Sequence, residues 1–450
     1  MPDQILTADP ESTSRLGNSP SRNEQNSHRI PSLYDVAIVG LGYVGLPTAI
    51  GFAGQGARVH GVDVSLDRLD VIRSGRADLL PEDAVALGQS LGNLLTVGSD
   101  LDAISDAAAV IVCVPTPVDE HLTPDLTALS RACESVVQRA RPGQVLVLTS
   151  TTYVGTTRDM LSGPLERRGF VIGKDIHVAF SPERINPGDS AFHHTDVPRV
   201  VGGVTPQCTK EAFALLGKAG VPLHEVSSPE AAELTKLYEN TFRAVNIALA
   251  NEMADISAAL GVQVTEVIDA AATKPYGFMP FQPGPGVGGH CIPCDPHYLL
   301  WQLREQRLQM PLVESAMRGI AARPSQVVTR CRELLAEKGV PVRGATIVIV
   351  GVAYKPGVED VRESPALEII ERLQALGATV GFVDPLVPQI RAHDGSTLHS
   401  WQATAELAAG LDLAVLHTRH PGSGLDWLDA APMVLDATFR ASELANRSLI

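Results

Sequence analysis

The feature that most restricts the fold is a short glycine pattern near the start of the chain. Residues 36–39 form an apolar run, and Gly40, Gly42 and Gly45 follow it with the spacing G-x-G-x-x-G. In a strand–turn–helix unit these glycines permit the tight turn, the approach of a pyrophosphate to the backbone, and the packing of helix on strand. Asp63 ends the next apolar run, at the distance that the pattern requires. The pattern predicts a Rossmann-like unit that binds a dinucleotide, and the alternative is a glycine-rich turn with no ligand.

The acidic residue of this unit also selects between cofactors. A carboxylate at Asp63 accepts hydrogen bonds from ribose hydroxyls and repels a 2′-phosphate, so the sequence favours NAD over NADP.

Residues 36–54 carry no charge and have the length of a membrane span. Because glycines and Pro47 interrupt them in a strand–turn–helix rhythm, we expect no membrane segment there.

The rest of the chain repeats an alternation of short β-branched runs and longer amphipathic stretches, which is typical of parallel sheets with crossover helices. The 450 residues exceed a single hydrophobic core. Residues 229–260 are rich in Ala, Glu and Leu and predict one long helix. We therefore predict an α/β protein with two Rossmann-like, doubly wound parallel-sheet domains joined by a central helical segment. The β-branched runs occupy residues 36–39, 58–62, 109–114, 145–149, 177–180, 345–351 and 379–384.

The expected boundaries follow this alternation. A polar leader at residues 1–32 is expected to be disordered, followed by the NAD-binding domain at 33–226, the helical segment at 227–330 and the second Rossmann-like domain at 331–450. Residues 56–63 and 377–384 are similar and end both units in an aspartate. The second unit reads Val-Ala-Tyr-Lys-Pro after Gly351, so we expect it not to hold a dinucleotide pyrophosphate in the same way.

Composition excludes some classes of partner and compartment. Lys and Arg number 36 against 51 Asp and Glu, which gives a net charge of −15 and argues against nucleic acid. The six cysteines are sparse and no secretory signal precedes the first strand. We therefore expect a cytoplasmic protein whose partners are neither nucleic acid nor membrane.

A thiol ends a glycine-rich loop at residues 283–295. Cys291 follows three glycines whose backbone N–H groups are expected to be open to an anion, and only a thiolate is strongly nucleophilic. The alternatives are a buried structural cysteine, a regulatory disulfide with Cys294, and a zinc site with His290 and His297. Because the chain has no second C-x-x-C pair, we predict no metal site.

Two further groups of polar residues suggest a site. Lys236, Asn240 and Arg243 have the spacing i, i+4, i+7 and share one face of the long helix. Two cations and an amide suit an oxyanion or a phosphate, although a solvated helix face is the alternative. Glu183 and Arg184 follow an apolar run, where α/β proteins place ligand loops.

Together these motifs resemble the nucleotide-sugar 6-dehydrogenases, the family of UDP-glucose, UDP-N-acetylhexosamine and GDP-mannose dehydrogenases. The similarity runs from about Tyr34 to the C-terminus, and the motifs occur in the order of the family. They are GLGYVGLP (40–47), VPTP (114–117), SPERINPG (181–188), the helix with Lys236 and Asn240, GPGVGGHC (284–291) and YKPGVEDVRESP (354–365).

The resemblance implies a four-electron oxidation of the sugar C6 alcohol to a carboxylate with two NAD. The thiolate of Cys291 would form a thiohemiacetal and then a thioester, which water hydrolyses. Lys236 and Asn240 would stabilise charge on the C6 oxygen, and Asp295 would activate water held by Glu183 and Thr151. The implied catalytic residues are Cys291, Lys236, Asn240, Asp295, Glu183 and Thr151.

The same resemblance assigns binding roles and partners. Family members form dimers or larger assemblies through the central helix, and their C-terminal domain binds UDP, so a UDP-sugar and a second copy of the chain are the expected partners. The implied NAD contacts are Gly40, Gly42, Tyr43, Val44, Gly45, Asp63, Arg68, Thr116, Thr151 and Arg362. The implied substrate contacts are Arg184, Ile185, Lys236, Asn240, Arg243, Gly288, Tyr354 and Lys355.

The identity of the sugar depends on the loops around the thiol. UDP-glucose enzymes usually read Gly-Gly-Ser-Cys and Phe-Pro-Lys-Asp, whereas this chain has His290 before the cysteine and Ile-Pro-Cys-Asp after it. Residues 275–281 resemble the N-acetylglucosamine type. We therefore expect a UDP-N-acetylhexosamine oxidised for polysaccharide or cell-surface glycan synthesis. The alternatives are a UDP-glucose dehydrogenase, a single-step NAD dehydrogenase of the hydroxyacid or 6-phosphogluconate type, and a catalytically silent nucleotide-sugar-binding protein.

Overall fold

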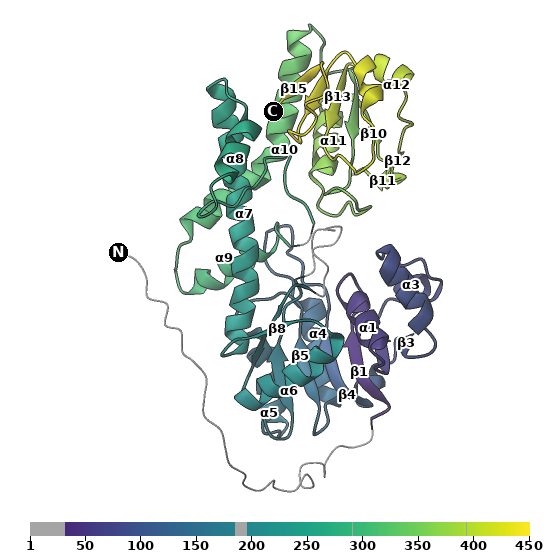
Figure 1. The fold of residues 1–450 in the computed structure, drawn as a ribbon, viewed down its shortest axis with the longest axis vertical. Coiled ribbons are helices and arrows are strands. Elements are labelled where there is room, and N and C mark those ends of the chain that lie inside the picture. The colour runs from purple at the N-terminus through teal and green to yellow at the C-terminus, as the bar shows by residue number, and fades with distance from the viewer. Residues whose placement is uncertain (1–31, 185–195, 290, 393) are drawn as a thin grey trace, which may run out of the picture.

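The computed structural model describes residues 32–184, 196–289, 291–392 and 394–450. The predicted leader, apart from Ser32, and the predicted substrate contact Ile185 lie outside these residues. Two sheet domains lie at opposite ends of a central helical segment (Figure 1). The predicted α/β class, with two parallel-sheet domains joined by helices, is confirmed.

The N-terminal domain contains an eight-stranded sheet in the order β3-β2-β1-β4-β5-β6-β7-β8. All neighbours pair in parallel except β6 and β7. Its first six strands have the order of a dinucleotide-binding Rossmann domain. The strands are β1 Tyr34–Val39, β2 Val59–Val62, β3 Leu95–Gly98, β4 Ala107–Val112, β5 Val145–Leu148, β6 His177–Phe180, β7 Arg199–Gly203 and β8 Leu223–Glu225.

Helices cover both faces of this sheet, which is why its strands read as continuous apolar runs. Ile38 on β1 packs in one core with Phe52, and Ala37 on the other face packs in a second core with Val136. The helices of this domain are α1 Gly45–Gly54, α2 Leu66–Arg73, α3 Pro81–Ser90, α4 Thr127–Arg139, α5 Gly163–Arg167 and α6 Pro206–Leu216.

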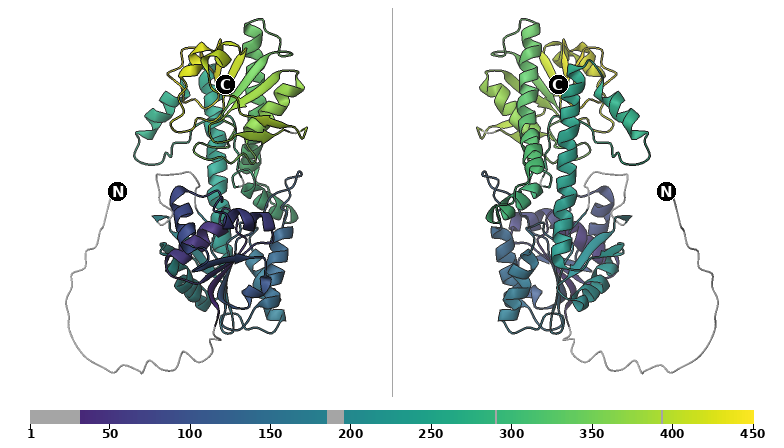
Figure 2. Two further views of the ribbon diagram at one scale, coloured as in Figure 1. Left: turned by 90° about the vertical axis from the view of Figure 1, so that its right-hand side faces the viewer. Right: turned by 90° about the vertical axis from the view of Figure 1, so that its left-hand side faces the viewer.

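The central segment is built on α7 (Pro229–Ala259), which extends from the first sheet domain toward the second (Figure 2). The predicted long helix is therefore confirmed. It begins with Ser228, whose side chain accepts a hydrogen bond from the Ala231 N–H, and with Pro229 at the first helical position. The segment also contains α8 (Val264–Ala272), α9 (Asp295–Glu305) and α10 (Pro311–Glu337).

The C-terminal domain contains a five-stranded parallel sheet in the order β10-β9-β13-β14-β15. Helix α10 runs past the predicted boundary at residue 330, and Cys331 and Leu335 on its second half pack in the core of this domain. The remaining elements are β9 Thr346–Val350, α11 Pro365–Ala375, β10 Thr379–Val383, β11 Gln389–Arg391, β12 Thr397–His399, α12 Ala405–Ala409, β13 Leu413–Leu416, β14 Val434–Asp436 and β15 Arg447–Leu449.

The unit β9-α11-β10 repeats the arrangement of β1-α1-β2, as the internal sequence similarity predicts. In the part of the chain that the structure describes, no helix is both long and apolar enough to cross a membrane.

Candidate active site

The turn between β1 and α1 has the form that a dinucleotide requires. Gly40 has φ +92°, and a Cβ there would lie 2.6 Å from the Cys113 carbonyl oxygen. A Cβ on Gly45 would lie 1.8 Å from the Gly40 carbonyl oxygen, whereas a Cβ on Gly42 would meet no atom within 4 Å. Protein packing thus requires the first and third glycines, and the second leaves open space where a pyrophosphate can approach. These residues fit NAD.

The carboxylate of Asp63 holds this turn in place. Its Oδ2 accepts the Leu41 N–H at 2.8 Å, and its Oδ1 accepts the Ser65 N–H at 2.9 Å. A carboxylate has about four acceptor positions, so capacity is left for ribose hydroxyls. Arg68 donates from Nε to the Leu41 carbonyl at 2.8 Å and forms a 2.7 Å ion pair with Asp78. Since Asp78 neutralises Arg68, this cation is not arranged to receive a 2′-phosphate.

A residue of the C-terminal domain reaches the same turn. The Arg362 guanidinium carbon lies 4.1 Å from the ring centroid of Tyr43, and Arg362 pairs with Asp360 at 2.6 Å. Burial and the neighbouring Asp78 raise the pKa of the Tyr43 hydroxyl above its ordinary value. The predicted NAD contacts Tyr43 and Arg362, which are 319 positions apart, therefore lie together.

Three other predicted NAD contacts lie near the carboxyl-terminal ends of the strands. Val44 is the residue before α1. Thr116 follows β4, and its carbonyl accepts the Tyr298 hydroxyl at 3.1 Å. Thr151 follows β5 and is half-buried. Their positions agree with the rule that parallel-sheet proteins place ligands at this edge.

Cys291 lies in the connection between α8 and α9. Its carbonyl accepts the Cys294 N–H at 3.3 Å and the Asp295 N–H at 2.9 Å, which forms the turn into α9. Cys291 is exposed, whereas the other five cysteines are buried. The protein around the thiol raises its pKa by desolvation, and Asp295 adds to this effect.

Three cations from different segments act on the thiol in the opposite direction. The charges of Lys236 of α7, and of Lys355 and Arg362 of the C-terminal domain, offset part of this rise in the pKa of Cys291, which stays above its ordinary value. Predicted residues of the central segment and of the C-terminal domain therefore act electrostatically on the same thiol.

The predicted catalytic residues of α7 contact both sides of this site. Lys236 Nζ donates to the Glu183 carbonyl at 2.9 Å, and Asn240 Nδ2 donates to Asp295 Oδ2. Asp295 is 3% exposed. Burial raises its pKa to about 6, although Lys236 and Asn240 act to lower it. Asp295 is thus a carboxylate suited to accept a proton near neutral pH.

Glu183 and Arg184 are held by partners that the sequence does not reveal. Glu183 Oε2 lies 3.5 Å from the guanidinium of Arg199, and its Oε1 accepts the Arg184 N–H at 2.8 Å. Arg184 pairs with Glu239 and donates to the Pro198 carbonyl at 2.7 Å. The sequence could have indicated Glu239 as a site residue, because it lies three residues after Lys236 on the same helix. No pattern in the sequence indicated Arg199, which begins strand β7.

Glu233 is a second residue that sequence analysis missed. It is 1% exposed, and its carboxylate accepts the N–H groups of Gly155 at 2.6 Å and Thr157 at 2.9 Å. Burial raises the pKa of Glu233 to about 7. This carboxylate ties the segment that follows Thr151 to α7, one turn before Lys236. Its position three residues before Lys236 on the same helix was the only feature of the sequence that could have indicated it.

The glycines before Cys291 serve close packing between two loops. A Cβ on Gly288 would lie 2.6 Å from the Glu363 carbonyl oxygen and 2.7 Å from Tyr354 Cβ. The Gly289 N–H donates to the Arg362 carbonyl at 3.1 Å. The expectation that this N–H is open to an anion is therefore wrong, because the C-terminal domain occupies it.

The other predicted substrate contacts surround this pair of loops. Burial raises the pKa of Tyr354 to about 12, and the ammonium of Lys355 lies 5.5 Å from its ring centroid. Arg243 is exposed on α7, three residues after Asn240, and its charge acts on Tyr354 in the opposite direction, lowering the pKa.

The alternative roles of the C-x-x-C pair involve Cys294, His297 and His290, and His290 lies outside the described residues. Cys291 and Cys294 are both free thiols, and burial raises the pKa of Cys294 to about 12. Among the residues with described positions, which leave out His290, no three His, Cys, Asp or Glu side chains converge as metal ligands.

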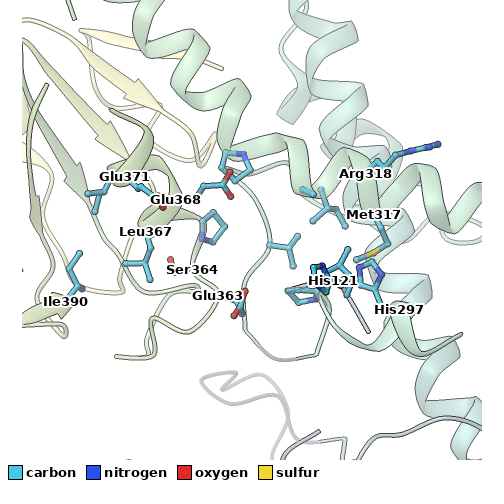
Figure 3. A pocket seen from close by; sticks show the side chains of 18 of the residues that line it. His121, His297, Met317, Arg318, Glu363, Ser364, Leu367, Glu368, Glu371 and Ile390 are labelled. Atoms are coloured by element: carbon cyan, nitrogen blue, oxygen red, sulfur yellow. The ribbon is translucent and has the colours of Figure 1, made fainter. Parts of the chain in front are cut away.

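A cavity of about 700 Å³ lies beside the cysteine loop, between α9, α10 and α11 (Figure 3). Residues near its wall include His121, His297, Met317 and Glu363. None of the predicted catalytic or binding residues lines it. Its wall combines three arginines with four glutamates, so its charge does not select one class of ligand.

Comparison with known proteins identifies the family. The models of its NAD binding domain, central domain and UDP binding domain match residues 34–218, 230–319 and 348–439. The chain belongs to the UDP-glucose/GDP-mannose dehydrogenase family. It is therefore an NAD-dependent dehydrogenase of nucleotide sugars, with a UDP-binding domain at its C-terminal end.

Relatives in this family match the chain over most of its length. A UDP-N-acetyl-D-glucosamine 6-dehydrogenase of Pseudomonas aeruginosa is 34% identical over 87% of this chain and 92% of its own. The structure of a UDP-N-acetylmannosamine dehydrogenase of Pyrococcus horikoshii matches with TM-score 0.83 at 31% identity, over 92% of this chain and 98% of that one. A UDP-glucose dehydrogenase of Pyrobaculum islandicum matches with TM-score 0.82 at 25% identity, over 94% and 98%. The overall fold therefore does not distinguish among sugars.

Proposed function

We propose that this dehydrogenase oxidises the C6 hydroxyl of a UDP-N-acetylhexosamine to the carboxylate, in two oxidations joined by a covalent bond to Cys291. The observation that carries the proposal is the convergence of Cys291, Lys236, Asn240 and Asp295 beside the turn that fits NAD. The resemblance of the sequence and the names of two relatives favour N-acetylated sugars. NAD bound at the turn supplies the hydride acceptor for both oxidations.

Lys236 and Asn240 stabilise the C6 oxygen when it gains negative charge. Both side chains project from one face of α7 toward the site, and an ammonium and an amide N–H are fixed donors in a partly buried position. Such preorganised donors lower the energy of an alkoxide and of a tetrahedral oxyanion. Arg243 and Lys355 supply positive charge for the phosphates of UDP.

Cys291 holds the sugar between the two oxidations. Its thiolate adds to the aldehyde carbon, which forms the C–S bond and places negative charge on the oxygen beside Lys236. After the second oxidation the product is a thioester. Water then adds to its carbonyl carbon, Asp295 accepts the water proton, and the C–S bond breaks to release the thiolate and the carboxylate. The positive charges of Lys236, Lys355 and Arg362 favour the thiolate as leaving group.

We also propose a homodimer formed through α7. Its large exposed apolar side chains follow spacings of four and seven residues, which places them on one stripe. This stripe lies about half a turn away from Lys236 and Asn240, so an interface there does not cover the catalytic face. The exposed side chains of the stripe are Leu234, Tyr238, Phe242, Leu249 and Ile256 of α7, and Leu260, which directly follows the helix.

The deciding experiment measures NADH formed per sugar consumed with UDP-N-acetylglucosamine, UDP-N-acetylmannosamine, UDP-N-acetylgalactosamine, UDP-glucose and GDP-mannose. We expect two NADH per sugar and the highest kcat/KM with one UDP-N-acetylhexosamine. The Cys291→Ser variant should lose overall turnover by a factor of about 1000 or more, while Cys133→Ala, a buried thiol on α4, should not.

Other outcomes would point to the rival functions. A preference for UDP-glucose would reject the proposed sugar. One NADH per sugar, with near-normal activity of Cys291→Ser, would indicate a single-step dehydrogenase. A ligand-induced rise in melting temperature without NADH would indicate a binding protein.

A further inference from the structure

The second Rossmann-like unit repeats the loop-holding carboxylate of the first. In the first unit, Asp63 Oδ2 accepts the Leu41 N–H at 2.8 Å. In the second, Asp384 follows β10 and its Oδ2 accepts the Val352 N–H at 2.7 Å, while its Oδ1 accepts the Leu386 N–H at 2.9 Å. The acidic residue that ends each unit therefore holds the turn after the first strand in both domains.

Asp63 and Asp384 differ in the groups that donate hydrogen bonds to their remaining acceptor positions. Asp384 is filled from within the chain, because it also accepts the N–H groups of Ala353 at 3.3 Å and Val387 at 3.0 Å, and His420 Nε2 lies 3.2 Å from its Oδ2. Asp384 is 5% exposed and His420 is 3% exposed. Although burial acts to raise the pKa of Asp384, the hydrogen bonds from His420 and the backbone lower it to about 2. An imidazole thus occupies the position where the first unit leaves room for a ribose.

The contacts of His420 define its tautomer. Its Nδ1 accepts the Gly357 N–H at 3.1 Å, so this nitrogen carries no proton. Its Nε2 faces an ionised carboxylate and therefore carries the proton. The ring connects Asp384 rigidly to Gly357 through one donor and one acceptor.

Gly357 ends a loop that reaches the catalytic thiol. Residues 354–357 include Tyr354, which packs against Gly288 and Gly289, and Lys355, whose charge acts on Cys291. The position of this loop therefore determines how close an ammonium group comes to the sulfur.

We propose that His420 is a positioning residue that holds the loop 354–357 against the Cys291 loop, where Tyr354 packs on Gly288 and Gly289 and Lys355 lies over the Tyr354 ring. In the second domain the acceptor positions of Asp384 are thus filled by the backbone and by a side chain of the same chain. The inference rests on the proposed roles of Cys291 and Lys355. It assigns to His420 a function that no catalytic or binding motif indicates.

The first test measures alkylation of Cys291 by iodoacetamide in the resting full-length protein, with the modified peptide identified by mass. It compares two variants in which an amide side chain of similar polarity replaces the imidazole of His420. His420→Asn places an amide oxygen near the Nδ1 position and can still accept from Gly357, whereas His420→Gln places its amide near Nε2 and reaches Asp384 instead. We expect the Gln variant to react about threefold to tenfold more slowly than wild type, because the thiolate loses its cation, and the Asn variant, which keeps the Gly357 contact but loses the Asp384 contact, to react at a rate between the two.

Two controls separate positioning from general damage. His399→Gln changes an exposed histidine on β12 and should leave the rate unchanged. Lys355→Met should slow alkylation by itself. Adding His420→Gln to it should have little further effect, since both changes remove the contribution of the Lys355 charge to the reactivity of Cys291. Equal rates for the Asn and Gln variants, or fully additive effects of His420→Gln and Lys355→Met, would overturn the proposal.

Steady-state kinetics gives a second readout. His420→Gln should raise the KM for the UDP-sugar while leaving the KM for NAD within about twofold of wild type. Equal changes in both constants would contradict a role confined to the loop 354–357. Because the alkylation assay contains no sugar nucleotide, its outcome is independent of which sugar the enzyme oxidises.

Discussion

At the residue scale, burial changes the ordinary properties of several side chains of the site. Asp295 is the clearest case, since a 3% exposed carboxylate beside a lysine and an amide has its pKa raised to about 6. The burial that disfavours its charge also makes it a stronger base. Cys291 is subject to opposing effects, because desolvation raises its pKa while three cations lower it.

We expect the pH profile of kcat to carry an acidic limb that belongs to Asp295. The base is active when ionised, and because its pKa is raised, protonation removes activity as the pH falls through about 6. Asp295→Asn should lower kcat by about 100-fold to 10,000-fold and abolish this limb. Rates measured from pH 5 to pH 9 test the expectation, with the exposed Asp429→Asn as the matched control. An unchanged acidic limb in Asp295→Asn would assign the limb to another group.

At the element scale, the site depends on two loops that approach each other across a domain boundary. The loop before Cys291 packs on residues 354–363, and glycine is needed where the two backbones come closest. Helix α7 provides the wall opposite them with Lys236 and Asn240. The loops must therefore keep their distance for the thiol and the helix to act on one substrate.

We predict that Gly288→Ala separates the two loops. The added Cβ would lie 2.6 Å and 2.7 Å from atoms of Glu363 and Tyr354, and neither position is the far end of a flexible side chain. The displacement should lower kcat/KM by about 100-fold. Gly284→Ala, in the same loop, would meet no atom within 4 Å and should stay within about twofold of wild type. Equal kinetics for the two variants would show that the close approach is not needed.

At the scale of the whole molecule, the two sides of α7 differ in character. One face contributes to the site, and the opposite stripe exposes apolar side chains along the length of the helix. An exposed apolar stripe of this length is typical of an interface between copies.

We expect Leu249→Glu to convert the proposed dimer into monomers. Leu249 is 53% exposed near the middle of the stripe, and an unpaired carboxylate buried in an interface should weaken association by roughly 100-fold or more. Light scattering coupled to size exclusion gives the mass directly. Val171→Glu, at a residue 55% exposed on the NAD-binding domain, is the control and should behave as wild type. A monomeric wild-type protein would refute the assembly itself.

Much of the fold was predictable because the signals are local. The apolar runs, the glycine triplet with Asp63 and the long helix after Ser228 each obey a period or a turn requirement within about 30 residues. The helix face that carries the proposed catalytic residues was predictable for the same reason, since i, i+4 spacing places Lys236 and Asn240 together. The Pro198 carbonyl that accepts from Arg184 and the Arg362 carbonyl that accepts the Gly289 N–H were not predictable, because both lie in loops outside these local patterns.

The sequence by itself determined the class of fold, the NAD-binding turn and the family to which the chain belongs, and it indicated Cys291 as the proposed nucleophile. Only the tertiary structure decided that Arg362 stacks on Tyr43, that Glu233 holds the loop after β5, and that His420 fills the position beside Asp384. Backbone dihedral angles and the periodic spacing of buried residues depend on residues that are close in the sequence, so a sequence pattern can predict them. The distance between side chains hundreds of residues apart depends on how the sheets and helices pack, and packing is a property of the whole chain.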